Sequence, residues 1–280
     1  MADDRANDGY RQAAELLRGA VRALKRGDAE AAESLAQQAC AMAPGDNRAP
    51  FIHGLALLTL GRPEAAVAPL EAAAKDNPDP AVETNLGTAL AQCGRDGEAL
   101  ACFRRAVSRE PPFPQAFFRL GVLLHLQHHL VEAKAVLQRA VALAPDDGEP
   151  QLVLADVLSE LGETAATKDA YTRALALRPG WPQARRGIAR TLMDTGDFAG
   201  AVAILRRLTE EDGGDTRSLL DLAFCLQELG AFDEALATYR QACTTNPRAY
   251  KQVLHSLLGA SRGTFWLRPS ELAKRLPRPR

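Results

Sequence analysis

Apolar residues recur at helical spacing along this chain, and the clearest stretch runs from Thr216 to Pro247. Its first half places apolar side chains three and four residues apart, at Leu219, Leu222, Ala223 and Leu226. Gly230 follows, and glycine can end a helix in the left-handed region without a Cβ penalty. A second apolar stripe comprises Ala235, Tyr239 and Ala242. The stretch predicts two short amphipathic helices joined by a tight turn, and such a hairpin needs neighbours to bury its faces.

The same turn and stop residues recur at a fixed period. The turn positions hold glycine, with His128 in the one vacant place: Gly27, Gly61, Gly94, Gly162, Gly196 and Gly230. The closing positions hold proline, with Gly213 in the vacant place: Pro44, Pro78, Pro111, Pro145, Pro179 and Pro247. Both series step by 34 residues, with a single step of 33 between the second and third units. Two independent markers share that deletion, so we infer seven tandem copies of one helical hairpin.

This pattern resembles the tetratricopeptide repeat (TPR) family, whose units carry Leu, a small residue, Gly, Ala, an aromatic or Leu, and Pro at fixed positions. The third unit matches well at Leu86, Gly87 and Phe103, and the fourth at Leu120, Gly121 and Leu137. The departures are Gly19, His53 and Thr167. The resemblance covers about residues 13 to 247. It implies an all-α fold, a right-handed α-α superhelical solenoid of helix hairpins.

The chain divides into three parts on this interpretation. We expect a disordered N-terminus over residues 1–8 and seven repeats over residues 9–249, with units starting at 13, 47, 80, 114, 148, 182 and 216. Residues 250–280 are expected to form a capping helix and a tail in which basic residues outnumber Glu271, its only acidic residue. The Phe265-Trp266 segment could cap the solenoid, fill its groove or bind a partner. No segment alternates with a period of two, so we predict no strands.

Charge and hydropathy exclude several classes of protein. Lys and Arg number 34 against 35 Asp and Glu, so no global field points to nucleic acid. No run approaches 18 apolar residues, which predicts no insertion into a membrane. The N-terminus lacks the apolar core of a secretory signal, so we expect a cytoplasmic protein. Arginine outnumbers lysine, an association with bacterial genomes rich in G and C.

No constellation for catalysis appears, and we predict neither an enzyme nor a cofactor. Five cysteines lie at scattered helical positions without a CxxC motif, so we expect reduced, half-buried thiols. His125 and His129 have the i, i+4 spacing of a metal pair. Because His128 occupies the turn where the helix should end, a surface turn is the preferred interpretation and no metal site is predicted.

The resemblance implies a concave groove lined by the first helix of each hairpin. Apolar linings of this kind mark interaction surfaces, and we expect Phe51, Leu55 and Phe118 to be the anchors. For Phe51 and Phe118, and for Leu17, Leu24 and Leu58, packing between helices is the alternative. The full set of predicted partner-binding residues is Phe51, Leu55, Asn85, Thr88, Phe118, Arg119, Val122, Arg186, Arg190, Phe224 and Lys251. The residues of the TPR clamp for a C-terminal carboxylate are largely missing.

These observations predict a non-enzymatic scaffold or adaptor that binds an extended peptide or helix in the groove. The partner is expected to be a protein or peptide. One alternative is a self-assembling TPR scaffold that forms homo-oligomers. The other is a substrate-targeting arm partnered with a separate transferase.

Overall fold

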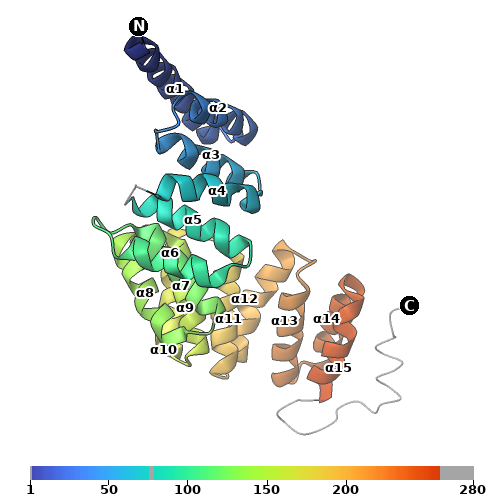
Figure 1. The fold of residues 1–280 in the computed structure, drawn as a ribbon. Coiled ribbons are helices and arrows are strands. Elements are labelled where there is room, and N and C mark those ends of the chain that lie inside the picture. Colours follow the sequence, from blue (N-terminus) through green and yellow to red (C-terminus); the bar gives the residue numbers. More distant parts are fainter. Residues whose placement is uncertain (1, 76–78, 259–280) are drawn as a thin grey trace. The chain divides into compact units, whose positions relative to one another are not determined.

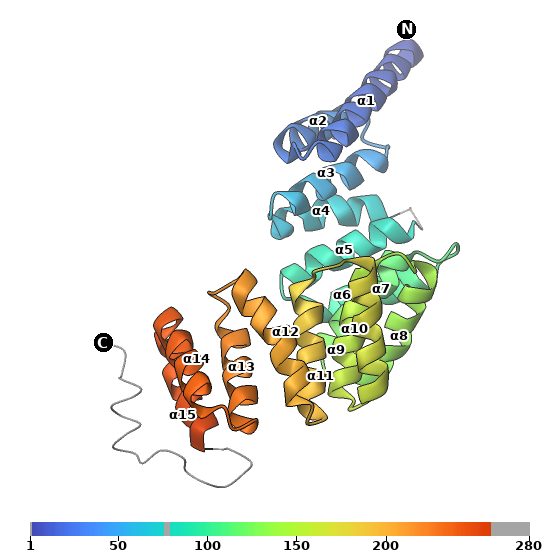
Figure 2. The ribbon, with the colours of Figure 1, turned by 180° about the vertical axis from the view of Figure 1, so that it is seen from behind.

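The computed structural model describes residues 2–75 and 79–258, with side chains from residue 9 onward except at positions 255, 257 and 258. All regular structure in these residues is helical, as the periodicity predicts (Figures 1 and 2). The chain forms two compact units, residues 1–145 and 146–280, which are described separately below. The predicted Phe265-Trp266 segment and basic tail lie outside the described residues.

The N-terminal unit contains four helical hairpins in chain order. They are α1 (Ala2–Lys25) with α2 (Ala29–Met42), α3 (Arg48–Thr59) with α4 (Pro63–Ala74), α5 (Pro80–Gln92) with α6 (Asp96–Val107), and α7 (Pro114–Leu126) with α8 (Leu130–Leu143). Helix α1 begins at Ala2, so the backbone of residues 2–8 is helical where we expected disorder. Neither proline nor glycine occurs between Ala2 and Gly9, so no residue there stops the helix.

The C-terminal unit contains three hairpins and one further helix. They are α9 (Gly148–Glu160) with α10 (Thr164–Leu177), α11 (Pro182–Asp194) with α12 (Phe198–Glu211), and α13 (Thr216–Glu228) with α14 (Phe232–Thr245), followed by α15 (Tyr250–Leu258). Val253 of α15 is fully buried beside Tyr239 and Ala249. The Tyr239 hydroxyl lies 3.2 Å from Gln227 Oε1, and Gln227 Nε2 donates to the Ser256 carbonyl at 3.4 Å. Helix α15 therefore covers the last hairpin.

The turns adopt the backbone that the repeat pattern requires. The predicted turn glycines have φ between +69° and +82°, and His128 takes the same left-handed conformation with φ of 58°. Many first helices begin with proline in the first turn or with an aspartate cap, which satisfies a free N–H group. Asp28, Asp79, Asp147, Asp197 and Asp215 each accept a backbone N–H at the start of a helix.

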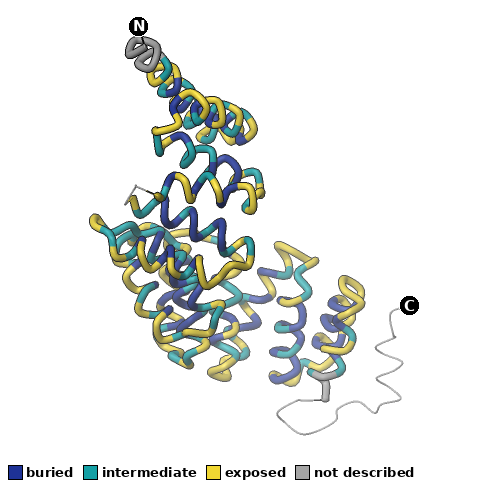
Figure 3. Tube along the Cα trace, viewed as in Figure 1, coloured by how far each residue is buried: buried dark blue, intermediate teal, exposed yellow. Residues whose placement is uncertain are grey.

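The core of each hairpin depends on close approach between its two helices. Gly87 of α5 faces Phe103 of α6, and a Cβ on Gly87 would lie 2.7 Å from the ring. Gly121 of α7 faces Leu137 of α8 in the same way, and a Cβ on Gly121 would lie 2.5 Å from Leu137 Cγ. Phe103 and Leu137 are almost completely buried. Figure 3 shows such buried positions along the helix faces that meet their neighbours, with exposed positions on the outside. The small residue of the repeat pattern is therefore a packing requirement.

Candidate functional site

The first helices of the hairpins share one face within each unit. In the N-terminal unit α1 packs on α3, α3 on α5 and α5 on α7, while in the C-terminal unit α9 packs on α11 and α11 on α13. Among the described helices, no comparable packing joins successive second helices. The first helices are therefore closer together than the second helices, and they form the inner face of each unit.

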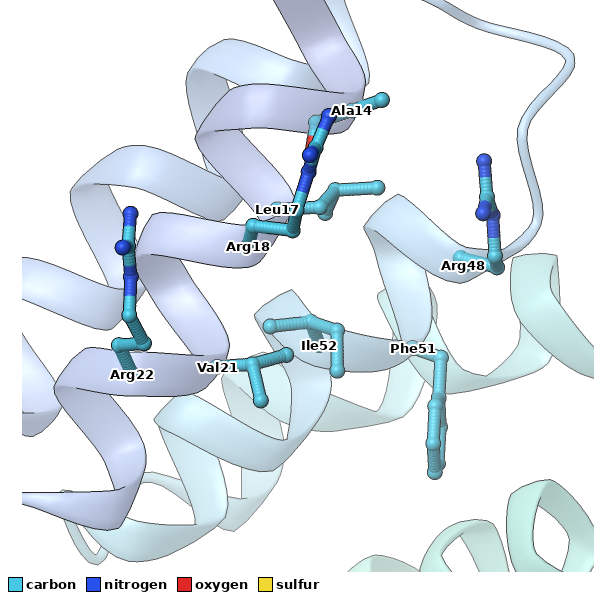
Figure 4. A pocket seen from close by; sticks show the side chains of 8 residues that line it. All are labelled: Ala14, Leu17, Arg18, Val21, Arg22, Arg48, Phe51 and Ile52. Atoms are coloured by element: carbon cyan, nitrogen blue, oxygen red, sulfur yellow. The ribbon is translucent and has the colours of Figure 1, made fainter.

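The inner face of the N-terminal unit holds a cavity of about 710 Å³ between α1 and α3 (Figure 4). This volume is in the range of ligand sites, which span about 300–1,000 Å³. Its lining residues are Ala14, Leu17, Arg18, Val21, Arg22, Arg48, Phe51 and Ile52. The α1 residues recur every three or four positions, so a single stripe of that helix supplies one wall. Residues from the start of α3 supply the other.

The cavity combines an apolar lining with a cationic edge. In Figure 4, Leu17, Val21 and Ile52 lie between the two helices, and the Phe51 ring extends to one side. The guanidinium groups of Arg18, Arg22 and Arg48 extend to the opposite side. Phe51, Val21 and Ile52 are half-buried, whereas Leu17 is only 6% exposed. Phe51 therefore leaves part of its apolar surface uncovered at the cavity, while Leu17 packs between helices.

The three arginines differ in their partners. Arg48 Nη2 lies 2.7 Å from Asp46 Oδ2, and the hydrogen bond from Arg48 lowers the pKa of the Asp46 carboxyl. Arg18 Nε donates to the Ala14 carbonyl of its own helix at 3.3 Å. Arg22 makes no hydrogen bond or ion pair with the side chains that the structure describes. Two of the three guanidinium groups therefore face solvent with no carboxylate partner among the described side chains.

The sequence-based prediction did not include Arg18 and Arg22, although their positions in the repeat could have indicated them. Arg18 occupies in the first unit the repeat position that Asn85 and Arg119 occupy in the third and fourth. Arg22 lies one helical turn further along α1. The early part of the groove was interpreted as apolar because leucine and valine dominate it, and the alternating cations were overlooked.

Most of the other predicted residues of the N-terminal unit make hydrogen bonds or packing contacts inside that unit. The Asn85 amide donates to the Ala81 carbonyl at 2.8 Å, and the Thr88 hydroxyl donates to the Thr84 carbonyl at 2.9 Å. Phe118 is 6% exposed, and the Arg119 guanidinium lies 5.5 Å from the centre of its ring. Packing between helices is thus the role of Phe118, which corrects its assignment as an exposed anchor. Leu55 and Val122 are half-buried but do not line the cavity.

The predicted residues of the C-terminal unit lie in a face of mixed charge. Arg186 Nη2 pairs with Asp215 Oδ2 at 2.7 Å, and its Nε donates to the Ser218 hydroxyl at 3.3 Å. Asp221 stands near Arg186, Arg190 and Arg217, and burial raises the pKa of its carboxyl despite these cations. Arg190 and Lys251 are exposed.

Two aromatic contacts complete this face. The half-buried Phe224 ring meets Phe198 edge to face, with 6.1 Å between ring centres. The Tyr171 hydroxyl donates a hydrogen bond to Asp156 at 2.6 Å. The Tyr171 ring packs against Gly187 of α11, where a Cβ would collide with it. Internal pairs therefore satisfy much of the charge in this unit.

The buried cysteines are held as protonated thiols at neutral pH. Burial raises the pKa of the thiols of Cys102 and Cys243, and that of Cys225 to about 12. A thiol that stays protonated is a weak nucleophile. Within the described residues no group of three His, Cys, Asp or Glu side chains could hold a metal ion. No described helix has the length and hydropathy needed to cross a membrane.

Comparisons with known proteins agree with this architecture. No curated protein matches the chain. Among solved structures, pilF of Pseudomonas aeruginosa is similar, with a TM-score of 0.66 and 20% identity over 82% of this chain and 99% of that one. YrrB, described as a TPR protein with an unusual peptide-binding site, has a TM-score of 0.58 and 20% identity over 65% and 93%. MamA has a TM-score of 0.56 and 18% identity over 61% and 94%.

Sequence models of the tetratricopeptide repeat match most of the chain. One matches residues 17–81 and 84–148, and a second matches residues 158–218 and 192–254. Together these matches span both units and all seven of the hairpins. This protein belongs to the tetratricopeptide repeat family.

Proposed function

We propose that this protein is a non-enzymatic adaptor that binds an extended peptide or a partner helix in the cavity between α1 and α3. The observation that carries the proposal is the cavity of about 710 Å³ with half-buried Val21, Phe51 and Ile52 on its lining. The tetratricopeptide repeat fold generally mediates protein–protein interactions. The similar fold of YrrB, with its peptide-binding site, supports the same class of ligand.

The binding mechanism follows from the rigidity of the two walls. Both walls are helices whose buried faces are fixed by neighbouring hairpins, with Ala13 and Ala49 fully buried in the same cluster. The cavity is formed before any ligand arrives, so the ligand loses most of the conformational freedom on binding. An apolar side chain that enters gains about 25 cal/mol for each Å² of apolar surface removed from water. Phe51 is the residue best placed to supply that surface because its ring is half-buried.

A peptide selection tests this proposal directly. Random peptides displayed on phage are selected on the immobilised full-length protein, on a Phe51→Glu variant and on a Phe232→Glu control. Phe232 is an aromatic residue 41% exposed in the C-terminal unit, and its substitution adds the same charge at a residue that does not line the cavity. We expect enrichment on the wild type and on the control but not on Phe51→Glu. Equal enrichment on all three proteins would refute binding at this cavity.

Light scattering on the same preparations addresses self-assembly. A monomer that enriches peptides supports the adaptor. Enrichment confined to an oligomeric fraction, with none on the monomer, would favour the self-assembling scaffold instead. Circular dichroism of both variants shows whether each glutamate leaves the helical fold intact.

A further inference from the structure

We infer that the segment bound between α1 and α3 is acidic, with apolar side chains in the cavity and carboxylates paired to Arg18 and Arg22. This inference rests on the proposed function and specifies the chemistry of its ligand. It starts from the charge of the lining, in which three of the eight residues are arginine and none is acidic. Asp46 balances Arg48 at 2.7 Å, so the excess positive charge belongs to Arg18 and Arg22.

Several arginines elsewhere on the hairpins pair with a carboxylate from another helix. In the N-terminal unit Arg62 pairs with Glu33 at 2.9 Å and Arg104 with Glu132 at 3.0 Å. In the C-terminal unit Arg185 pairs with Glu211 at 2.7 Å within one hairpin, and Arg206 pairs with Glu234 of the next hairpin at 2.6 Å. Arg18 and Arg22 have no carboxylate partner among the described side chains, and both line a cavity. Their side chains reach an apolar cavity, where a ligand can supply the missing charge.

The geometry of the pair restricts the ligand further. Arg18 and Arg22 are four residues apart on α1, one turn or about 6 Å along the helix axis. Two carboxylates match this spacing when they lie at i and i+4 of a ligand helix, or at i and i+2 of an extended segment, where the separation is about 6.6 Å. The guanidinium groups extend to the side of the cavity opposite Phe51 (Figure 4). The ligand therefore needs an acidic edge and an apolar edge.

Protein is a better match than nucleic acid for this surface. Phosphate backbones are recognised through broad positive surfaces. Here two arginines without a carboxylate partner among the described side chains border a lining of Val21, Ile52 and Phe51, and the chain as a whole has a net charge of −1. A short segment that joins bulky apolar residues with Asp or Glu complements both features. The carboxylates increase the association rate as well as selecting the partner.

The peptide selection described above is extended to test the inference. The test variant is Arg18→Gln with Arg22→Gln, and the matched control is Arg139→Gln with Arg173→Gln. The control arginines are exposed on the second helices α8 and α10, away from the inner faces. We expect wild-type protein and control to enrich peptides in which Asp or Glu accompanies bulky apolar residues. Individual enriched peptides should bind the test variant about five- to thirtyfold more weakly, because each exposed ion pair contributes modestly.

The outcomes separate this inference from the proposed function. Peptides that depend on Phe51 but show no acidic bias, or that bind the test variant as tightly as the wild type, would refute the acidic ligand and leave the groove intact. Loss of all dependence on Phe51 would overturn the proposed function and this inference together. Displacement of bound peptide by a single-stranded RNA oligomer, with stronger binding of the RNA, would also overturn the inference in favour of a polyanion.

Discussion

The packing of Gly121 against Leu137 leads to a prediction about stability. Gly121 lies on α7 and faces α8 in the fourth hairpin. A Cβ at this position would lie 2.5 Å from Leu137 Cγ and 2.7 Å from Cδ2. Leu137 is completely buried, so its side chain has no free space into which to rotate. Gly121→Ala must therefore push the two helices apart or force Leu137 out of its rotamer.

The sign of the effect follows from two opposing magnitudes. Alanine in the interior of a helix is favoured over glycine by about 1 kcal/mol. Extra carbon in a packed core costs about 1–3 kcal/mol. Carbon atoms pack best at about 3.5–4.0 Å, so a contact at 2.5 Å lies far inside the repulsive range and the cost falls at the upper end. We expect Gly121→Ala to lower the free energy of unfolding by about 2 kcal/mol.

Urea unfolding followed by circular dichroism measures this change, and Gly97→Ala provides the matched control. Gly97 lies in α6, and a Cβ there meets nothing within 4 Å. The same substitution should therefore stabilise the protein at Gly97, by about 0.5 kcal/mol. Adding Leu137→Ala to Gly121→Ala should cost less than the sum of the two single changes, because the smaller side chain accommodates the new methyl group. If Gly121→Ala proved as stable as Gly97→Ala, the packing argument would be refuted.

Two further predictions concern the backbone and pH. Gly94→Ala adds a methyl group in open space but at φ of +74°, so it should destabilise by about 1 kcal/mol through the backbone alone. Urea unfolding beside Gly97→Ala checks this, and equal midpoints would contradict it. Burial raises the pKa of the Asp221 carboxyl in the folded protein above its ordinary value of 3.8. The protonated carboxyl therefore stabilises the fold fully below pH 3.8, and this contribution is lost as the pH rises through the folded pKa. Asp221→Asn should therefore be more stable than wild type at neutral pH, with the difference shrinking in acid. A difference that grows on acidification would contradict the assignment.

Most of the fold was predictable because the repeat is encoded by local backbone chemistry. A left-handed turn residue is needed every 33 or 34 residues, and glycine marks that place in the sequence. His128 was identified at the same position from spacing alone, and its φ of 58° confirms that prediction. The N-terminus of α1 was missed because residues 1–8 precede the first repeat and were expected to be disordered. A helix needs only permissive residues to extend by two turns.

Exposure within the groove was less predictable, because it depends on neighbours far apart in the sequence. Leu17, Phe51 and Phe118 occupy the same position in three repeats. Leu17 and Phe118 are each 6% exposed, yet Phe51 is half-buried and lines a cavity. The Arg119 guanidinium lies 5.5 Å from the centre of the Phe118 ring. This contact depends on the conformations of both side chains, which the repeat pattern does not specify. Repeat position identifies the inner face but not which of its residues remains available to a ligand.

The contrast between the two units shows why one arginine pair is available to a ligand and another arginine is already committed. Arg186 finds its carboxylate in Asp215, the cap of the next first helix, and Asp215 also accepts from the Ser218 hydroxyl at 2.5 Å. In the N-terminal unit the corresponding connector offers Asp46, but Arg48 holds both oxygens of that carboxylate at 2.7 and 2.9 Å. A ligand carboxylate at Arg186 must displace an existing pair, whereas at Arg22 it displaces only solvent. Since the net gain of an exposed ion pair is about 1 kcal/mol or less, we expect the proposed acidic segment to bind at Arg22 rather than at Arg186.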